Sequence, residues 1–173
     1  MKIKSTKFKD LKIIKSPVHI DRRGFFRETF KKKFFFKKKF IFTCVSSSKK
    51  NVLRGLHLQK KNSQAKLITV LSGKIFDVCV DCRKKSKTFG KHFSINMSEN
   101  NNTSLLIPAG FAHGFYTLSN DVILHYKCSN YRHKDSETGI LWNDKTLKIK
   151  WPNKKPIVSD KDQKNITFEE FIS

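Results

Sequence analysis

The most regular feature of the chain is an alternation of apolar and polar residues with a period of two, which is typical of β-strands. It is clearest in residues 74–82, where Phe76 and Val80 fall on one face and Asp77 on the other. Residues 66–71 have the same character and lead into this run across a Ser-Gly pair. The pattern therefore predicts a hairpin of two half-buried strands.

The same alternation returns in four further runs, at residues 92–97, 104–107, 122–128 and 147–151. Clusters of turn-forming residues separate most of these runs. Many short strands at regular spacing predict an all-β sandwich, jelly roll or barrel. Apart from the Lys/Phe segment of residues 30–42, only residues 167–171 favour a helix. The length of 173 residues is that of one ordinary domain, so we expect residues 1–173 to form a single unit.

The chain carries 37 Lys and Arg against 14 Asp and Glu, a formal net charge of +23. Such a field attracts anions of any kind. A surface that binds phosphates would more typically use Arg for its planar fork, whereas 31 of the 37 cations are Lys. We therefore interpret the lysines mainly as solvent-facing residues, and a nucleic-acid partner is not favoured.

Residues 30–42 interleave lysine with phenylalanine, as some single-strand nucleic-acid binders do. A short amphipathic helix explains the segment equally well, because Phe30, Phe34 and Phe35 fall on one helical face. The helix is the interpretation that we favour.

The four cysteines are Cys44, Cys79, Cys82 and Cys128. Cys79 and Cys82 have the spacing of a zinc knuckle, but no second ligand pair follows, and in a strand they point to opposite faces. We expect four free thiols in a reducing cytoplasm. The basic N-terminus has no signal-peptide core, and no apolar run reaches the length of a membrane span, so no membrane association is expected.

Four sequence blocks carry the candidate chemistry. They are Leu53-Arg54-Gly55-Leu56-His57, residues 81–90 ending in Ser-Lys-Thr-Phe-Gly, residues 107–115 around His113, and Ile140-Leu141-Trp142-Asn143-Asp144. In this order they resemble the dTDP-4-dehydrorhamnose 3,5-epimerase family, and the likeness runs from about Asp10 to Asp162. The resemblance implies a cupin-like jelly roll (a double-stranded β-helix) with minor short helices. It also implies a homodimer and a cofactor-free reaction on a dTDP-linked 4-keto-6-deoxy hexose, toward an L-rhamnose precursor.

The implied reaction removes the hydrogens at C3 and C5, which flank the C4 ketone, and returns a proton to the opposite face. It needs a base, a group that stabilises the enolate oxygen, and an opposed acid. His57 fits the base, because an imidazole has a pKa of roughly 6.5. The resemblance makes Asp162 its orienting partner and Tyr126 the acid. It also places Lys66 at the enolate oxygen and His113 nearby.

Each of these residues also has a plain structural alternative. His57 and Tyr126 could be core residues, with the phenol hydroxyl bonded to the backbone. Lys66 is one of 31 lysines, and Asp160 is a rival to Asp162 in the same short loop.

The resemblance also assigns substrate contacts. Arg23 and Arg54 would hold the diphosphate with bidentate guanidinium forks. Further contact positions are Glu28, Tyr131, Arg132, Glu137 and Lys161. Strict alternation places Arg54 and His57 on opposite faces of one strand, whereas the resemblance implies that both belong to the site, so we expect a bulge or bend at Gly55. No metal is expected, because Leu58 and Gln59 stand where a metal-binding cupin would need a second His.

The chain departs from the family pattern at the nucleotide end of the expected site. A substrate-binding Gln and Asn of the family are replaced by Phe42 and Cys44, and the aromatic residue that stacks on thymine falls at Arg132, after Tyr131. Epimerisation at C3 alone, or on a GDP-linked or other nucleotide sugar, therefore stays open. The alternatives from other classes are a cupin that binds a sugar nucleotide without turnover and a nucleic-acid-binding cupin.

Overall fold

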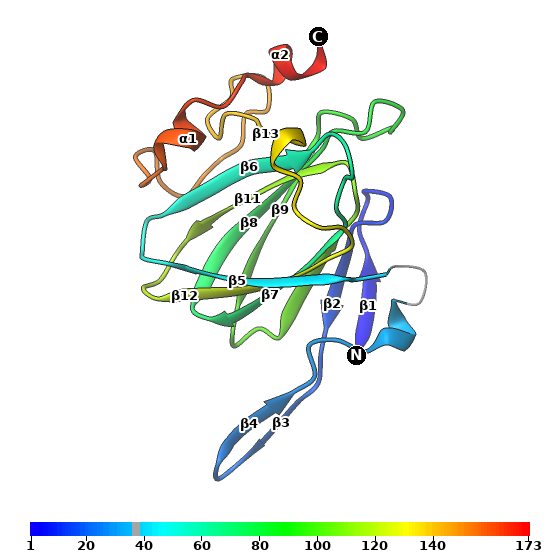
Figure 1. The fold of residues 1–173 in the computed structure, drawn as a ribbon. Coiled ribbons are helices and arrows are strands. Elements are labelled where there is room, and N and C mark those ends of the chain that lie inside the picture. The colour runs from blue at the N-terminus through cyan, green and yellow to red at the C-terminus, as the bar shows by residue number, and fades with distance from the viewer. Residues whose placement is uncertain (36–38) are drawn as a thin grey trace.

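The computed structural model describes residues 1–35 and 39–173, and its main body is two antiparallel sheets that face each other (Figure 1). The first sheet has the strand order β1 (Lys2–Ser5), β2 (Lys12–Lys15), β10 (Thr103–Ile107), β7 (Lys66–Ser72), β12 (Val122–Cys128), β5 (Phe42–Ser48). The second has the order β13 (Glu137–Gly139), β6 (Leu53–Gln59), β11 (Phe111–Thr117), β8 (Lys74–Asp81), β9 (His92–Ser98). The prediction of an all-β jelly roll is confirmed.

The core lies between the two sheets, and a second apolar cluster lies outside the five-stranded sheet. The inner core includes Ile68, Cys79 and Leu124, and the outer cluster includes Val80 and Cys82. The C-terminal part of the chain covers the outer cluster. Strand β8 is therefore buried on both faces, and the prediction that it is half-buried was wrong. Cys79 and Cys82 do point to opposite faces, as the alternation predicts.

The predicted hairpin of residues 66–71 and 74–82 does not form. Strand β7 pairs with β10 and β12, whereas β8 pairs with β9 and β11, so these consecutive strands belong to different sheets. Gly73 joins them with φ of +81°, and a Cβ there would lie 2.7 Å from Ser119 Oγ. The turn therefore carries the chain from one sheet to the other rather than back along the first.

Residues 147–151 are not a strand, although their sequence alternates. Leu147 is buried in the outer cluster, and the Trp151 indole donates a hydrogen bond to the Trp142 carbonyl at 2.7 Å. The apolar side chains of this segment thus cover the five-stranded sheet without adding to it.

The helix predicted near the C-terminus is present as α2 (Phe168–Ile172), with a capping box between Thr167 and Glu170. A second helix, α1 (Asp160–Gln163), was not predicted. Ser159 caps α1 by accepting a hydrogen bond from the backbone N–H of Asp162.

The amphipathic helix expected in the Lys/Phe segment is reduced to the 3₁₀ turn η1 (Lys32–Phe34). Phe30 and Phe35 stack with ring centroids 5.1 Å apart, Phe40 packs against both, and Phe34 is exposed. The prediction that Phe34 shares a buried face with Phe30 and Phe35 was wrong. Part of the segment, residues 36–38, lies outside the described residues.

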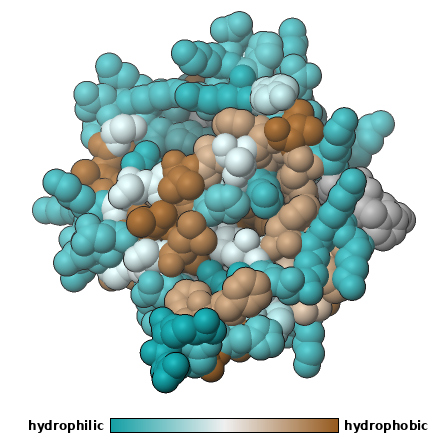
Figure 2. Space-filling view, turned by 60° about the horizontal axis from the view of Figure 1, so that its bottom comes forward, coloured by the Kyte–Doolittle hydropathy of each residue, from teal (hydrophilic) through white to brown (hydrophobic). Residues whose placement is uncertain are grey.

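Strands β3 (Val18–Asp21) and β4 (Gly24–Arg27) form a hairpin that projects from the body (Figure 1). Arg27 fixes its base by donating hydrogen bonds to the carbonyls of Val70 at 3.0 Å and Glu99 at 3.2 Å. Figure 2, with the hairpin end turned forward, shows apolar side chains gathered near the middle of this side within a hydrophilic surround.

Within residues 1–35 and 39–173, no helix is both long enough and apolar enough to cross a membrane.

Candidate active site

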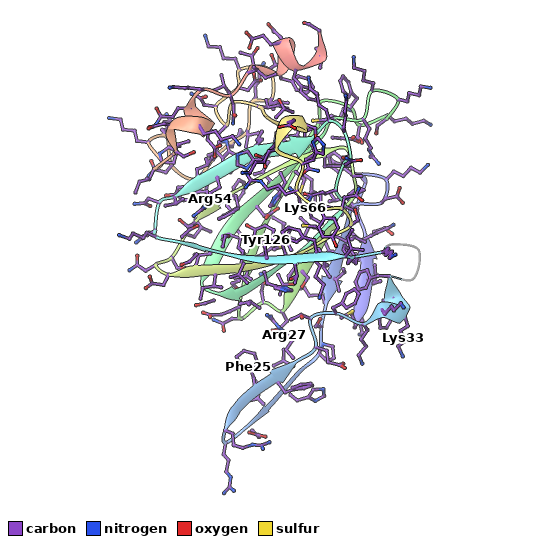
Figure 3. The ribbon with its side chains drawn as sticks, viewed as in Figure 1. Phe25, Arg27, Lys33, Arg54, Lys66 and Tyr126 are labelled. Carbon is purple, nitrogen blue, oxygen red and sulfur yellow. The ribbon has the colours of Figure 1, made fainter. Side chains whose placement is uncertain are left out.

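A cleft of about 390 Å³ opens between the two sheets and collects most of the predicted site residues. Its lining includes Arg54, His57, Lys66, His113, Tyr126, Arg132 and Glu137. Arg54, Lys66 and Tyr126 come from three different strands and surround the space between the sheets in Figure 3. The cleft therefore brings imidazole, phenol and cationic side chains into a single cavity.

His57, on β6, is held by a buried carboxylate. Its Nε2 lies 2.6 Å from Asp162 Oδ1, and the other oxygen of Asp162 accepts the Gly55 backbone N–H at 3.1 Å. Burial raises the pKa of Asp162. The hydrogen bond and charge of His57 and the Gly55 N–H together lower this pKa by more, so the carboxyl titrates below its ordinary range. A carboxylate can only accept, so the imidazole carries its proton on Nε2 and keeps a lone pair on Nδ1.

A bulge at Gly55 allows Arg54 and His57 to line the same cleft. His57 pairs with His113 on β11, whereas Arg54 pairs with Phe115, and the register shifts between these positions. Gly55 has φ of +130°, and a Cβ there would lie 2.5 Å from the Gly114 Cα. Only glycine fits this approach of two backbones, and the predicted bulge is confirmed.

Arg54 is oriented by the neighbouring strand β5. Its Nε donates to Ser48 Oγ, and a terminal nitrogen donates to the Ser47 carbonyl, both at 2.9 Å. The side chain thus reaches the cleft with its position already fixed.

Tyr126 lies on β12, in the sheet that faces His57. Its hydroxyl is 3.0 Å from Ser46 Oγ, and Cys44 is its cross-strand partner on β5. Burial raises the pKa of the phenol well above its ordinary value, and this effect outweighs the lowering by Ser46. Tyr126 therefore keeps its proton at neutral pH, as a proton donor must.

Lys66 begins β7 at the floor of the same cleft, opposite Cys128. Burial lowers the pKa of its ammonium group, although nearby thiols and Glu137 act in the other direction. A partly desolvated cation of this kind interacts strongly with a negative oxygen placed beside it.

His113 is on β11, where it is the cross-strand partner of His57 on β6. It also contacts a buried carboxylate. Its Nε2 is 2.8 Å from Asp77 Oδ2, and both side chains are almost completely removed from solvent. Two histidines on the neighbouring strands β6 and β11 therefore line the cleft, and each contacts a buried aspartate.

One rim of the cleft is a charged cluster around Glu137. Arg132 donates two hydrogen bonds to this carboxylate, at 3.1 and 2.8 Å, and Lys161 donates one at 2.7 Å. These contacts, led by the bond from Arg132, lower the pKa of Glu137 to about 2. The guanidinium plane of Arg132 is thus held at the cleft edge.

Three predicted contact residues lie away from the cleft of their own chain. Arg23 is on the tip of the projecting hairpin, where its side chain is 84% exposed and paired with Asp21. Glu28, just beyond that hairpin, pairs with Lys31. Tyr131 is 67% exposed, and its ring is tilted against Phe42 with centroids 6.3 Å apart.

The sequence did not point to several residues that shape the cleft. Ser46 and Asp77 hold the side chains of Tyr126 and His113, and Gln64 contributes to the lining. The available signal was Asp77 itself, an acidic residue within an otherwise apolar strand. Phe42 and Cys44, which stand where the family has Gln and Asn, do line the cleft.

The fold and the site together define a jelly-roll protein in which a carboxylate-paired imidazole and a buried phenol line one cleft. The model of the dTDP-4-dehydrorhamnose 3,5-epimerase family matches residues 5–170, and the chain belongs to that family. The Shigella flexneri enzyme of that name is 44% identical over 181 residues, which cover 99% of this chain and 100% of the relative.

Solved structures agree with this assignment and with the predicted cupin-like fold. The dTDP-6-deoxy-D-glucose-3,5-epimerase from Legionella pneumophila, in complex with dTDP-4-keto-L-rhamnose, is 41% identical with a TM-score of 0.92, over 96% of this chain and 92% of that one. A 3'-monoepimerase from Streptomyces bikiniensis, in complex with dTDP-quinovose, is 29% identical with a TM-score of 0.88, over 94% and 85%.

Proposed function

We propose that this protein epimerises a dTDP-linked 4-keto-6-deoxy hexose at C3 and C5, converting dTDP-4-dehydro-6-deoxyglucose to dTDP-4-dehydro-L-rhamnose. The observation that carries the proposal is the placement of the His57–Asp162 pair and Tyr126 on facing walls of one cleft, in a chain of this family. Proton transfer alone suffices for the reaction, so no cofactor or metal is required.

His57 is the base that removes the proton from each carbon beside the ketone. Asp162 fixes the ring with its proton on Nε2 and stabilises the imidazolium that forms when Nδ1 takes up the substrate proton. The same base serves C3 and C5 in turn, because between the two inversions His57 releases its proton to water and Tyr126 takes one up from water.

The enolate formed in this step needs a positive partner and a donor. Lys66 supplies the charge at the developing oxygen, and burial of the ammonium strengthens that interaction. His113, held by Asp77, contributes a further polar contact to the sugar. Tyr126, protonated and on the opposite wall, returns the proton from the other face and so inverts the centre.

The rim holds the nucleotide diphosphate. Arg54 provides a guanidinium fork for phosphate oxygens, and Arg132 and Lys161 add positive charge beside it. Glu137 sets the position of these two cations. Tyr131 with Phe42 offers an apolar aromatic surface next to Arg132, which suits a stacked base.

We further propose that the enzyme is a cytoplasmic homodimer, because a second copy explains the hairpin. Ile20, Phe25 and Phe26 are 81%, 64% and 64% exposed on it, which is unusual for such large apolar side chains. If a second subunit covers these side chains, Arg23 and Glu28 of the first subunit would lie at the cleft of the second. The four free cysteines suit a reducing compartment.

A mixing experiment tests this arrangement. Two inactive variants, His57→Ala and Arg23→Ala, should regain roughly a quarter of wild-type activity when their subunits are exchanged, because half the dimers then contain one intact site. No recovery in dimers shown to be mixed would place Arg23 outside the partner's cleft.

The main competing function is epimerisation at C3 alone, as in the 3'-monoepimerase named above, or on another nucleotide sugar. The replacement of polar residues by Phe42 and Cys44 is the observation that favours it. Deuterium incorporation from D₂O into dTDP- and GDP-linked 4-keto sugars, read by NMR, decides between them. Deuterium at both C3 and C5 of the dTDP sugar is the expected result, and incorporation at C3 alone, or only into the GDP sugar, would contradict the proposal.

A further inference from the structure

Three donor side chains of different chemistry meet inside the barrel, at the wall of the cleft. Cys79 on β8 is the cross-strand partner of His113 on β11, and Asp77 lies two residues from Cys79 on the same face of β8. All three side chains are buried, and their donor atoms lie within 4.8 Å of one another. Two central, paired strands therefore fix an imidazole, a thiol and a carboxylate around one point.

The present contacts among these groups are hydrogen bonds. The Asp77 carboxylate accepts from His113 Nε2 at 2.8 Å and from the Cys79 thiol at 3.7 Å. Protons thus occupy the positions at which a cation would lie. The proposed epimerisation gives no role to Cys79.

We propose that Asp77, Cys79 and His113 bind zinc, and that the bound ion inhibits the enzyme. Zinc prefers nitrogen, sulfur and carboxylate ligands at about 2.0 to 2.3 Å in a tetrahedral arrangement. Such bonds require donor separations of about 3.3 to 3.6 Å, so modest side-chain rotations, without movement of the strands, complete the site.

The charges of the site balance in the bound state. Zinc displaces the thiol proton into solution, and the imidazole shifts its single proton from Nε2 to Nδ1. The thiolate and the carboxylate together then neutralise the ion. His113 also lines the cleft, so a water from the cleft side would supply the fourth ligand.

Inhibition follows from the position of the site. The ion replaces the His113–Asp77 hydrogen bond and moves the imidazole proton to Nδ1, which changes the polar contact that His113 offers to the sugar. Because the inference concerns metal binding, it stands or falls separately from the identity of the epimerisation substrate.

Cobalt(II) provides a direct readout, because a thiolate ligand gives an intense charge-transfer absorption in the near ultraviolet. Reduced, chelator-washed wild-type protein should bind one cobalt ion with this band, and zinc should displace it. Cys79→Ala should lose the band and bind zinc at least about 100-fold more weakly. Cys82→Ala is the matched control, because that thiol points to the outer cluster, and it should behave as wild type.

Activity supplies the second readout. In the presence of a chelator, Cys79→Ala should retain wild-type epimerase activity, and added zinc should inhibit wild type but not this variant. A wild-type cobalt complex without a thiolate band overturns the proposal. So does zinc inhibition that persists in Cys79→Ala but disappears in Cys128→Ala, because the ion would then be held by the thiols of the cleft.

Discussion

His57 Nε2 lies 2.6 Å from Asp162 Oδ1, although the two residues are 105 positions apart in the chain. The contact joins strand β6 to the short helix α1, whose first turn also caps on Ser159. The C-terminal segment therefore has a direct part in the site, because it delivers the carboxylate that sets the tautomer of His57.

Replacing His57 with Ala should abolish hydrogen exchange at both C3 and C5. The reason is that the proposed mechanism uses His57 as the base for both centres, whereas it assigns His113 only a polar contact to the sugar. The measurement is deuterium incorporation by NMR, with circular dichroism and dTDP binding as controls for the fold. Retained exchange at either carbon would remove His57 from the role of base.

Asp162→Asn should lower kcat by about 100-fold or more while leaving dTDP binding nearly unchanged. An amide can donate to Nε2, which allows the ring to place its proton on Nδ1 and removes the lone pair from the substrate side. Asp160→Asn is the matched control, because Asp160 lies in the same turn without contacting His57. Equal losses in the two variants would show that the turn, and not the carboxylate, is what matters.

Acid stability should depend strongly on Asp81. Burial raises the pKa of this carboxyl, but bonds from Arg83, Ser86 and Thr88 outweigh that effect and lower it to about 2. A lowered pKa in the folded state means that stability is fully present above the ordinary pKa of 3.8 and is lost as the pH falls toward 2. The gain at neutral pH is on the order of 2 kcal/mol.

Asp81→Asn should therefore reduce the free energy of unfolding at pH 7 and weaken its dependence on pH between 4 and 2. Urea unfolding at several pH values measures both quantities. An unchanged slope below pH 4 would show that other carboxyls cause the loss of stability in acid.

For most strands the sequence predicted which side chains share a face more reliably than it predicted which strands pair. Alternation sets which side chains share a face, and the inward direction of Tyr126 followed from it. It does not say which strands pair, so β7 and β8 were predicted to form a hairpin. In the structure the turn at Gly73 places them in different sheets. Burial on both faces of β8 also escaped the pattern, because the covering segment contains the irregular residues 147–151.

The prediction of the site included residues that belong to local sequence motifs. It missed residues that reach the site only because distant strands pack together. Arg54 and His57 belong to one block, and the bulge at Gly55 could be inferred because the family resemblance places both residues in the site. Asp77 was placed on the polar face of its strand, which was taken to face solvent. In the folded chain that face lies in the interior of the barrel, where the carboxylate meets His113.

The Lys/Phe segment, residues 30–42, should bind nucleic acid only by loose attraction that salt removes. Non-specific phosphate contacts weaken steeply with salt, and Phe30, Phe35 and Phe40 pack on one another and are not free to stack on bases. Fluorescence anisotropy with single-stranded oligonucleotides measures this. Glutamine at the lysines of residues 31–33 should weaken binding no more than glutamine at the lysines of residues 84–87. Submicromolar binding at physiological salt would contradict the prediction.

Tyr126→Phe should separate exchange from inversion. The change keeps the ring that packs on the inner face of β12 and removes only the hydroxyl, together with its contact to Ser46. His57 still removes the substrate proton and can return one to the same face, which needs no second group. Deuterium incorporation into unchanged substrate should therefore persist.

Inverted product, in contrast, should accumulate much more slowly in this variant, because the phenol that the proposed mechanism uses as proton donor is gone. The ratio of exchange to epimerisation, read from one NMR time course, is the quantity to compare with wild type. Ser46→Ala is a useful companion, since it removes the partner of the phenol and keeps the proton, and it should preserve most of the inversion. Inversion of C3 and C5 by the Phe variant at close to the wild-type rate would assign the acid to another group or to water, and Tyr126 would then be a packing residue of the barrel.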